Sequence, residues 1–196
     1  MNAKRTLAVS AATFAALALM VGFDMTRRFD DAVMLALHSL AGGTAFERGM
    51  AVLTWAGSAW WVLPAAALMS LSRSRQGAQA LVPLGLVLAA VALSNLVKDI
   101  VARDRPALWP LLVTETSASF PSSHSMQSAA LAWAGWIVFA GGSNRRRLAA
   151  VLLAYVALIG LSRMVLGVHY PSDVLGGWLL ATATAMAFRI MLDRRA

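Results

Sequence analysis

Long apolar runs separated by short polar segments are the dominant pattern along this chain. Six of these runs approach the length of about 20 residues that a helix needs to cross the hydrocarbon core of a bilayer. They lie at Thr6–Phe23, Gly49–Leu71, Ala78–Val97, Met126–Gly142, Leu148–Ser162 and Val174–Leu192. The fifth run is short unless residues 163–166 extend its helix. The pattern therefore predicts an all-α, polytopic membrane protein built as a bundle of six transmembrane helices.

Two of the polar segments are long enough to have structure of their own. Residues 24–46 mix apolar side chains with acidic and basic ones, which is typical of amphipathic helices that lie on a membrane surface. Gly42 and Gly43 interrupt this segment, so we expect one or two short amphipathic helices on either side of them. The second segment, residues 107–120, is expected to be a loop.

Composition favours membrane insertion over a soluble fold. Only 13% of the 196 residues are charged and 59% are hydrophobic, and the mean hydropathy is +0.67. Soluble domains carry about 25% charged residues. The length suits a single domain, residues 1–196, and the first apolar run lacks a clear cleavage site, so we expect it to be retained as a helix. The chain has no cysteine, which excludes disulfides and thiolate metal sites.

The net charge of +8 would suggest nucleic-acid binding in a soluble protein, but here the positive residues lie between the apolar runs. Cytoplasmic segments of membrane proteins are enriched in lysine and arginine, so we expect no nucleic-acid partner and use these residues to orient the helices. With the N-terminus inside, the inner segments hold Lys4, Arg5, Arg73, Arg75, Arg145, Arg146, Arg147, Arg189, Arg194 and Arg195. The outer segments hold Arg27, Arg28, Arg48, Lys98, Arg103, Arg105 and Arg163. This distribution predicts cytoplasmic termini and places every cluster of candidate catalytic residues on the outer side.

The first cluster joins the end of the third apolar run to an Arg-Pro pair. Lys98 precedes Arg105 by seven residues, about two turns of helix, so both side chains can reach one anion. The arginine offers two parallel hydrogen bonds that suit phosphate. The alternative is a basic flank that anchors a helix end among lipid headgroups.

The second cluster, Ser119-Phe120-Pro121-Ser122-Ser123-His124, comes just before the fourth apolar run. Proline is favoured in the first turn of a helix, so Pro121 predicts that a helix begins here. The backbone amides of the next residues would have no intrahelical partner and could bind an anion. Ser122 and Ser123 add hydroxyl donors, and His124 can exchange a proton near neutral pH. The alternative is a serine-rich helix cap with an incidental histidine.

The third cluster places Arg163, His169 and Asp173 between the fifth and sixth runs. Charged residues near hydrocarbon cost about 2.5–3.5 kcal/mol each, so they indicate a functional site. Pro171 predicts that a helix begins beside it, with His169 in the preceding turn and Asp173 in the first turn. A carboxylate bonded to one imidazole nitrogen would orient the other for nucleophilic attack. The alternative is a His–Asp pair that only caps the helix.

A metal site is a further alternative, because imidazole and carboxylate groups are ligands for zinc or iron. His124, His169 and Asp173 are the candidate ligands. The three cationic side chains of the clusters would repel a divalent ion, so we expect neither a metal nor another cofactor. They favour an oxyanion as the bound group instead.

Together the three clusters resemble the signature of the type 2 phosphatidic acid phosphatase (PAP2) superfamily. The family pattern is lysine, six residues and Arg-Pro, then Pro-Ser-Gly-His, then Ser-Arg, five residues, histidine, three residues and aspartate. The chain has, in the same order and spacing, Lys98…Arg105-Pro106, Pro121-Ser122-Ser123-His124 and Ser162-Arg163…His169…Asp173. The one departure is Ser123, which stands where the family has glycine. A serine keeps the backbone N–H that contacts phosphate in the family pattern.

The resemblance implies hydrolysis of a lipid phosphate or diphosphate through a phosphohistidine, without a metal. His169 would be the nucleophile and Asp173 would orient it, while His124 would protonate the leaving oxygen and then help to activate water. The phosphoryl group would be held by Lys98, Arg105, Ser122, Ser123 and Arg163.

The sequence thus predicts a phosphatase of the inner (cytoplasmic) membrane, acting at its outer face on a lipid of the bilayer, with undecaprenyl diphosphate as the preferred substrate. Phosphatidylglycerophosphate, phosphatidic acid and lipid A phosphates are alternatives, and the oligomeric state is left open. Two rivals come from other classes. A transporter or non-catalytic lipid-binding protein would place its site near the bilayer midplane. Vanadate-dependent oxidation, known from soluble relatives, fits poorly with membrane embedding.

Overall fold

The computed structural model describes residues 2–41, 43, 45–111, 113, 115–141 and 143–194, except for the side chains at 74, 76 and 78. Its α-helices are α1 (Ala3–Gly22), α2 (Arg27–Ala41), α3 (Ala45–Leu53), α4 (Ala59–Ser72), α5 (Val82–Val101), α6 (Ser123–Phe139), α7 (Arg145–Val165) and α8 (Pro171–Asp193). Two 3₁₀ helices, η1 (Thr54–Gly57) and η2 (Ser74–Leu81), flank α4. The described ranges contain no strand, which confirms the all-α prediction.

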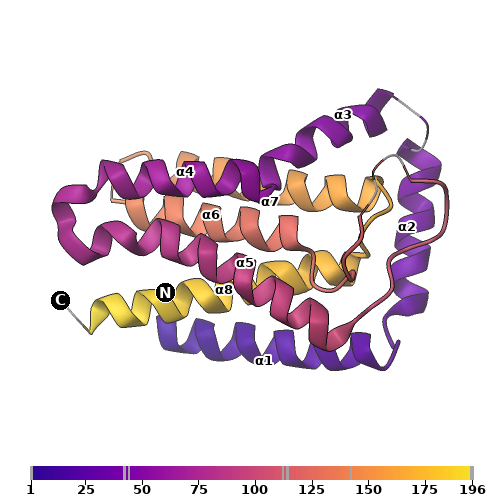
Figure 1. Ribbon diagram of the computed structural model, residues 1–196, viewed down its shortest axis with the longest axis horizontal. Coiled ribbons are helices and arrows are strands. Elements are labelled where there is room, and N and C mark those ends of the chain that lie inside the picture. Colours follow the sequence, from indigo (N-terminus) through magenta and orange to yellow (C-terminus); the bar gives the residue numbers. More distant parts are fainter. Residues whose placement is uncertain are drawn as a thin grey trace.

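The long helices form a bundle that α2 crosses at one end (Figure 1). α3 leans away from the bundle at that same end. The first residues of α1 and the last residues of α8 lie toward the opposite end, while the loops before α6 and before α8 lie near α2. Helix α2 lies within residues 24–46 and is one of the short amphipathic helices that were expected there, whereas α3 begins at Ala45 and continues into the expected second span. Gly42 lies outside the described residues, and Gly43 has a left-handed φ of 69°.

α6 is the central helix and packs against α4, α5, α7 and α8. Its inward side carries small residues such as Ala130 and Ala134, which pack with Val62 of α4, Leu86 of α5 and Ala181 of α8. All five of these side chains are fully buried. Small side chains let helix backbones approach closely, which is how helices associate within a membrane.

Four helical segments of the described chain are long and apolar enough to cross a membrane: Ala3–Gly22, Gln79–Val101, Arg145–Val165 and Pro171–Asp193. The number is five if Ala45–Gly57 and Ala59–Ser72, bent by 43° relative to each other, form one broken span. α6 has 17 residues and rises about 26 Å, slightly less than the hydrocarbon thickness of about 30 Å. The protein is therefore an integral, multi-pass membrane protein, but the expected number of six spans is not confirmed.

The second and fifth expected runs differ most from their helices. The second is broken after Gly57, where the chain passes so close to α7 that a Cβ at this position would lie 2.5 Å from Ile159 Cγ2. The fifth is longer than expected, because α7 continues through Arg163 to Val165. The fourth expected run corresponds to α6, which ends at Phe139. Gly142, the expected last residue of that run, lies outside the described residues.

Candidate active site

Three stretches of chain meet at the end of the bundle that α2 crosses (Figure 1). They are the end of α5 with its following loop, the turn before α6, and the turn between α7 and α8. The ring of His38 on α2 stacks on the ring of Trp109 in the loop, with their centres 4.0 Å apart. The exposed fractions of the main candidate residues are small: Lys98 4%, Arg163 2%, His169 1% and Asp173 0%.

Asp173 lies in the first turn of α8, which begins at Pro171 as predicted. Its Oδ2 accepts hydrogen bonds from the backbone N–H of Tyr170 over 2.8 Å and from the Ser119 hydroxyl over 2.5 Å. The same Oδ2 lies 3.4 Å from Nδ1 of His169. A carboxylate in this position favours the tautomer with its proton on Nδ1, and this leaves the lone pair on Nε2.

The Nε2 atom of His169 faces the guanidinium of Arg105, whose Nη1 is 3.2 Å away. Backbone carbonyls hold that guanidinium in place: Nη1 donates to Val168 over 2.8 Å and Nε donates to Ser117 over 2.7 Å. Burial, followed by the positive charges of Arg163 and Arg105, lowers the pKa of His169 well below its ordinary value. The imidazole is therefore neutral near pH 7, and its free lone pair points toward a cation.

Lys98 and Arg163 add two more cations. Lys98 donates from Nζ to the carbonyl of Ala118. Arg163 donates from Nη1 to Thr54 Oγ1 over 2.8 Å and pairs through Nη2 with Glu115. The Nε of Arg163 has no hydrogen-bond partner among the described residues, although only 2% of this side chain is exposed. Because a buried N–H without an acceptor is costly, this donor favours an anion in the site.

The second cluster differs from its expected geometry at Pro121. Helix α6 begins at Ser123 with Ser122 as its N-cap, so Pro121 precedes the helix and does not lie in its first turn. The Ser122 hydroxyl takes the capping position because it accepts from the N–H of Ser125, over 3.5 Å. Ser123 is not among the residues with positive φ, so replacing the family's glycine by serine causes no backbone strain here.

His124 is the second residue of α6, partly buried, and it interacts electrostatically with Arg163 and Glu115. The helix start that carries it is joined to α8 by the N–H of Ser122, which donates to the carbonyl of Asp173 over 3.0 Å. Gly177 permits this close approach, since a Cβ there would lie 2.8 Å from the carbonyl oxygen of Ser122. The start of α8 thus lies beside both histidines: His169 comes just before it in the chain, and the helix start that carries His124 is hydrogen-bonded to it.

A buried ion-pair network behind Asp173 was not predicted from the sequence. Arg103 donates from Nη1 to Asp173 Oδ1 over 2.6 Å and from Nη2 to Asp30 Oδ2, on α2, over 2.7 Å. Asp30 also accepts from the N–H of Ser172 over 3.0 Å and from its hydroxyl over 2.6 Å. Both carboxylates are fully buried. Helix α2 is therefore connected through Arg103 to the carboxylate that lies beside His169.

Glu115, in the loop before α6, was also missed, and it places a carboxylate among the cations. Its Oε1 pairs with Nη2 of Arg163, and its Oε2 lies 3.8 Å from Nη2 of Arg105. Burial acts to raise the pKa of this carboxyl group, but the two arginines outweigh burial and hold the pKa below its ordinary value. The site thus already binds a negatively charged oxygen group where two guanidiniums converge.

The sequence contained only weak signals for these partners. Arg103 stands at an unspecified position of the first motif, and Ser119 lies just outside the second. Asp30 and Glu115 lie in segments expected to be an amphipathic helix and a loop, where an acidic residue is ordinary. Their roles depend on contacts between distant parts of the chain, which a motif does not describe.

This arrangement can bind a tetrahedral oxyanion and attack its central atom. A neutral imidazole supplies the nucleophilic nitrogen, and the surrounding cations neutralise the oxygens of the bound group. In the parts of the chain that the structure describes, no three His, Asp or Glu side chains are grouped so that they could hold a metal ion.

Comparison with known proteins identifies the same family. Residues 79–196, which include all three clusters, match the family model of the PAP2 superfamily. Phosphatidylglycerophosphatase B of Bacillus subtilis (strain 168) is 39% identical over 93 residues, which are 45% of this chain and 45% of that protein. Decaprenylphosphoryl-5-phosphoribose phosphatase of Mycolicibacterium smegmatis is 35% identical over 156 residues, which cover 76% of this chain and 82% of the relative. The chain thus spans under half of the first relative and most of the second.

Two solved structures share the fold. A transmembrane PAP2 type phosphatidylglycerolphosphate phosphatase from Bacillus subtilis superimposes with a TM-score of 0.87 over 96% of both chains, at 24% identity. LpxE of Aquifex aeolicus gives a TM-score of 0.60 over 79% of this chain and 93% of its own, at 19% identity. At these identities the likeness concerns the arrangement of the helices.

Proposed function

Because the chain belongs to the PAP2 superfamily, we propose that it is a lipid phosphatase that works through a phosphohistidine. The observation that carries this proposal is the orientation of His169. Its Nε2 faces Arg105 at 3.2 Å, while its Nδ1 lies 3.4 Å from Asp173. A neutral imidazole held in this way is a nucleophile directed at a position that attracts phosphate.

The reaction takes place in two transfers. In the first, the lone pair of His169 Nε2 forms a bond to phosphorus, the bond from phosphorus to the leaving oxygen breaks, and His124 gives that oxygen a proton. Asp173 stabilises the imidazole as it becomes positively charged. In the second, water attacks phosphorus, His124 takes a proton from it, and the P–N bond breaks to release inorganic phosphate and free His169.

Cationic side chains neutralise the phosphoryl oxygens during both transfers. Lys98, Arg105 and Arg163 supply the charge, and Ser122 and Ser123 add donors from the start of α6. The Nε of Arg163 is a buried donor that no described residue uses. In many other phosphoryl-transfer sites a divalent cation neutralises the phosphoryl oxygens. Here these side chains would do so, and the proposed reaction therefore needs no metal or cofactor.

The proposed substrate is a lipid that carries a terminal phosphate or diphosphate. The M. smegmatis relative, whose alignment covers 76% of this chain, is named for a decaprenyl-linked phosphate. This name supports a polyprenyl lipid as the substrate, and undecaprenyl diphosphate is our first candidate. Phosphatidylglycerophosphate is the second candidate, supported by the name of the B. subtilis relative. Phosphatidic acid and lipid A phosphates complete the set to be tested.

The proposed placement is in the cytoplasmic membrane, with both termini inside and the histidines on the extracytoplasmic side. Six crossings result if α6 and the bent pair α3–α4 join the four clear spans. The whole chain, residues 1–196, would then be a single domain. The support is the lysine and arginine distribution, together with the position of the site at the end of the bundle away from the first residues of α1 (Figure 1).

The test is phosphate release by purified protein, measured across this panel of lipids in the presence of EDTA. We expect activity on at least one lipid, no inhibition by EDTA and inhibition by vanadate. His169→Ala, which removes the nucleophile, is the blank. If correctly folded protein releases no phosphate from any member of the panel, the lipid-binding or transport alternative replaces the phosphatase.

A further inference from the structure

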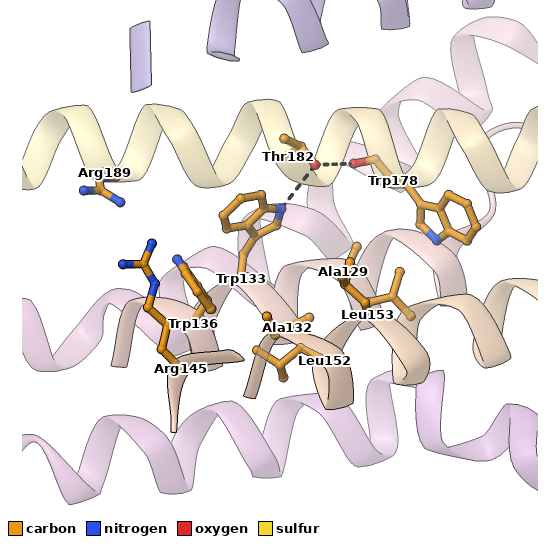
Figure 2. Close-up of a pocket in the computed structure, with 12 residues that line it drawn as sticks. Ala129, Ala132, Trp133, Trp136, Arg145, Leu152, Leu153, Trp178, Thr182 and Arg189 are labelled. Atoms are coloured by element: carbon orange, nitrogen blue, oxygen red, sulfur yellow. Dashed lines mark hydrogen bonds between the residues drawn. The ribbon is translucent and has the colours of Figure 1, made fainter. Parts of the chain in front are cut away.

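A cavity lies between three helices, toward the end of the bundle away from the histidines. Helices α6, α7 and α8 enclose this cavity of about 500 Å³ (Figure 2). Alanines, leucines and the rings of Trp133, Trp136 and Trp178 form most of its wall. Its volume falls within the range of about 300–1,000 Å³ that is typical of small-molecule sites.

This cavity is separate from the candidate active site. Trp178 stands at the end nearest the histidines and packs on Gly160, where a Cβ would lie 2.5 Å from Cζ2 of the indole. From there the lining residues of α8 continue to Arg189, and those of α7 run back to Arg145. Both directions lead away from Asp173 and Arg163. The cavity therefore extends from Trp178 toward the far end of the bundle.

The far end of the cavity is positively charged. Figure 2 shows the guanidiniums of Arg145 and Arg189 at the same end, opposite Trp178. The guanidinium carbon of Arg145 lies 5.2 Å from the ring centre of Trp136. Neither arginine forms an ion pair with a carboxylate in the described part of the chain. The cavity thus combines an apolar interior with two cations that no carboxylate of the described residues pairs with.

These features match one kind of molecule, a lipid with an anionic headgroup. We propose that the cavity binds one anionic phospholipid from the membrane leaflet opposite the active site. One acyl chain lies along the three tryptophans, and the phosphodiester lies between Arg145 and Arg189. Each basic side chain near a headgroup strengthens such binding about fivefold. A phosphodiester has no terminal phosphate, so this lipid is a bound component of the protein and not a substrate.

The sequence supports the same location. Arg146 and Arg147 follow Arg145 in the first turn of α7, where the helix dipole favours negative charge and three arginines are unfavourable without an anion nearby. Ser143 and Asn144 lie with these arginines around a second hollow, so the cavity and this hollow share Arg145. The headgroup would therefore lie at the start of α7.

The experiment is a lipid titration of the purified, delipidated protein, followed by native mass spectrometry. The probes are dioleoylphosphatidylglycerol and, as the zwitterionic comparison, dioleoylphosphatidylcholine. We expect one phosphatidylglycerol to be retained with a Kd at least tenfold below that of phosphatidylcholine. In Arg145→Ala/Arg189→Ala this preference should be lost, because two contributions of about 1 kcal/mol amount to roughly a tenfold to thirtyfold change.

Two further variants make the outcome specific. Arg28→Ala/Arg75→Ala removes the same charge from exposed positions outside the cavity and should bind like the wild type. Ala149→Phe fills part of the cavity and should weaken binding of both lipids. Circular dichroism and gel filtration show whether each variant is folded. Lipid binding is measured directly, so the result does not depend on phosphatase activity.

The proposal is overturned if the wild type binds the two lipids equally or if the Arg145/Arg189 variant binds like its control. It is also overturned if inorganic phosphate alone displaces the bound lipid, because the site would then recognise a free anion without the tail.

Discussion

Glu115 contacts the two guanidiniums that the proposed function assigns to the phosphoryl group of a substrate. The carboxylate pairs with Arg163 and lies 3.8 Å from Arg105, and the proposed reaction needs both guanidiniums for phosphate. The two anions therefore compete. We expect Glu115→Gln to bind vanadate more tightly than the wild type does, by about three- to tenfold, since a partly exposed ion pair contributes roughly 1 kcal/mol. Inhibition constants for vanadate give the comparison.

The matched control for this variant is Asp104→Asn. Asp104 is an exposed acidic residue of the same loop, so its change removes the same charge without freeing either arginine. Its vanadate affinity should equal that of the wild type. Weaker binding in Glu115→Gln would contradict the competition and would mean that the carboxylate organises the arginines for phosphate.

In the proposed mechanism, the lowered pKa of His169 determines how activity depends on pH. The imidazole attacks only in its neutral form, and burial together with the charges of Arg163 and Arg105 keeps it neutral until the pH falls well below 6.5. With para-nitrophenyl phosphate, whose leaving group needs little proton donation, the acid limb of kcat/KM should therefore lie below pH 6.5. In Arg105→Gln the limb of the remaining activity should move to higher pH. A wild-type limb at or above pH 6.5 would contradict a neutral, buried nucleophile.

At the scale of helices, α2 contributes to the site through Asp30. Arg103 bridges this carboxylate and Asp173, and both acidic side chains are fully buried. Removing one member of a buried ion pair typically costs about 3–5 kcal/mol. We expect Asp30→Ala to lose stability in this range and also to lose activity, because the guanidinium of Arg103 that holds Asp173 then loses its other carboxylate partner. Thermal unfolding in detergent and kcat are the measurements.

The neighbouring position provides the control. Asp31 pairs with Arg27 over 3.0 Å, but their side chains are 30% and 41% exposed. Exposed pairs contribute about 0–1 kcal/mol, so Asp31→Ala should have little effect on unfolding or kcat. Equal losses in the two variants would show that Asp30 acts only through the folding of α2.

The helices also show what the sequence can and cannot predict. Pro171 correctly marked the start of α8, and hydropathy located α1, α5 and α7, because chain-local signals determine these elements. The break after Gly57 was not predicted, since it depends on contact with Ile159 of a distant helix. In the same way, the motif residues were recognisable by spacing, whereas the partnership of Arg103 with Asp30 joins positions 73 residues apart in the chain.

At the scale of the whole molecule, the two ends of the bundle lie on opposite sides of the membrane in the proposed orientation. The chain has no cysteine, so single cysteines can report sidedness without background. Ala107, in the loop near α2, and Ser143, between α6 and α7, are both exposed. In intact cells, Ala107→Cys should react with an impermeant maleimide and Ser143→Cys should not, while both should react after permeabilisation. Reaction of Ser143→Cys alone would invert the proposed orientation.

The central claim is that His169 forms a covalent bond to phosphorus, and trapping the phosphoenzyme tests it most directly. The wild type, His169→Ala and His124→Ala are mixed with ³²P-labelled para-nitrophenyl phosphate and quenched within one turnover in alkaline detergent, because phosphohistidine is labile in acid. We expect label on the wild type, none on His169→Ala, and at least as much on His124→Ala. His124 contributes little to the departure of nitrophenolate, but its loss slows attack by water, a step where general catalysis contributes about 10²- to 10⁴-fold. Label on His169→Ala and none on His124→Ala would reverse the two roles. Turnover by the wild type without any trapped label would contradict the covalent mechanism itself.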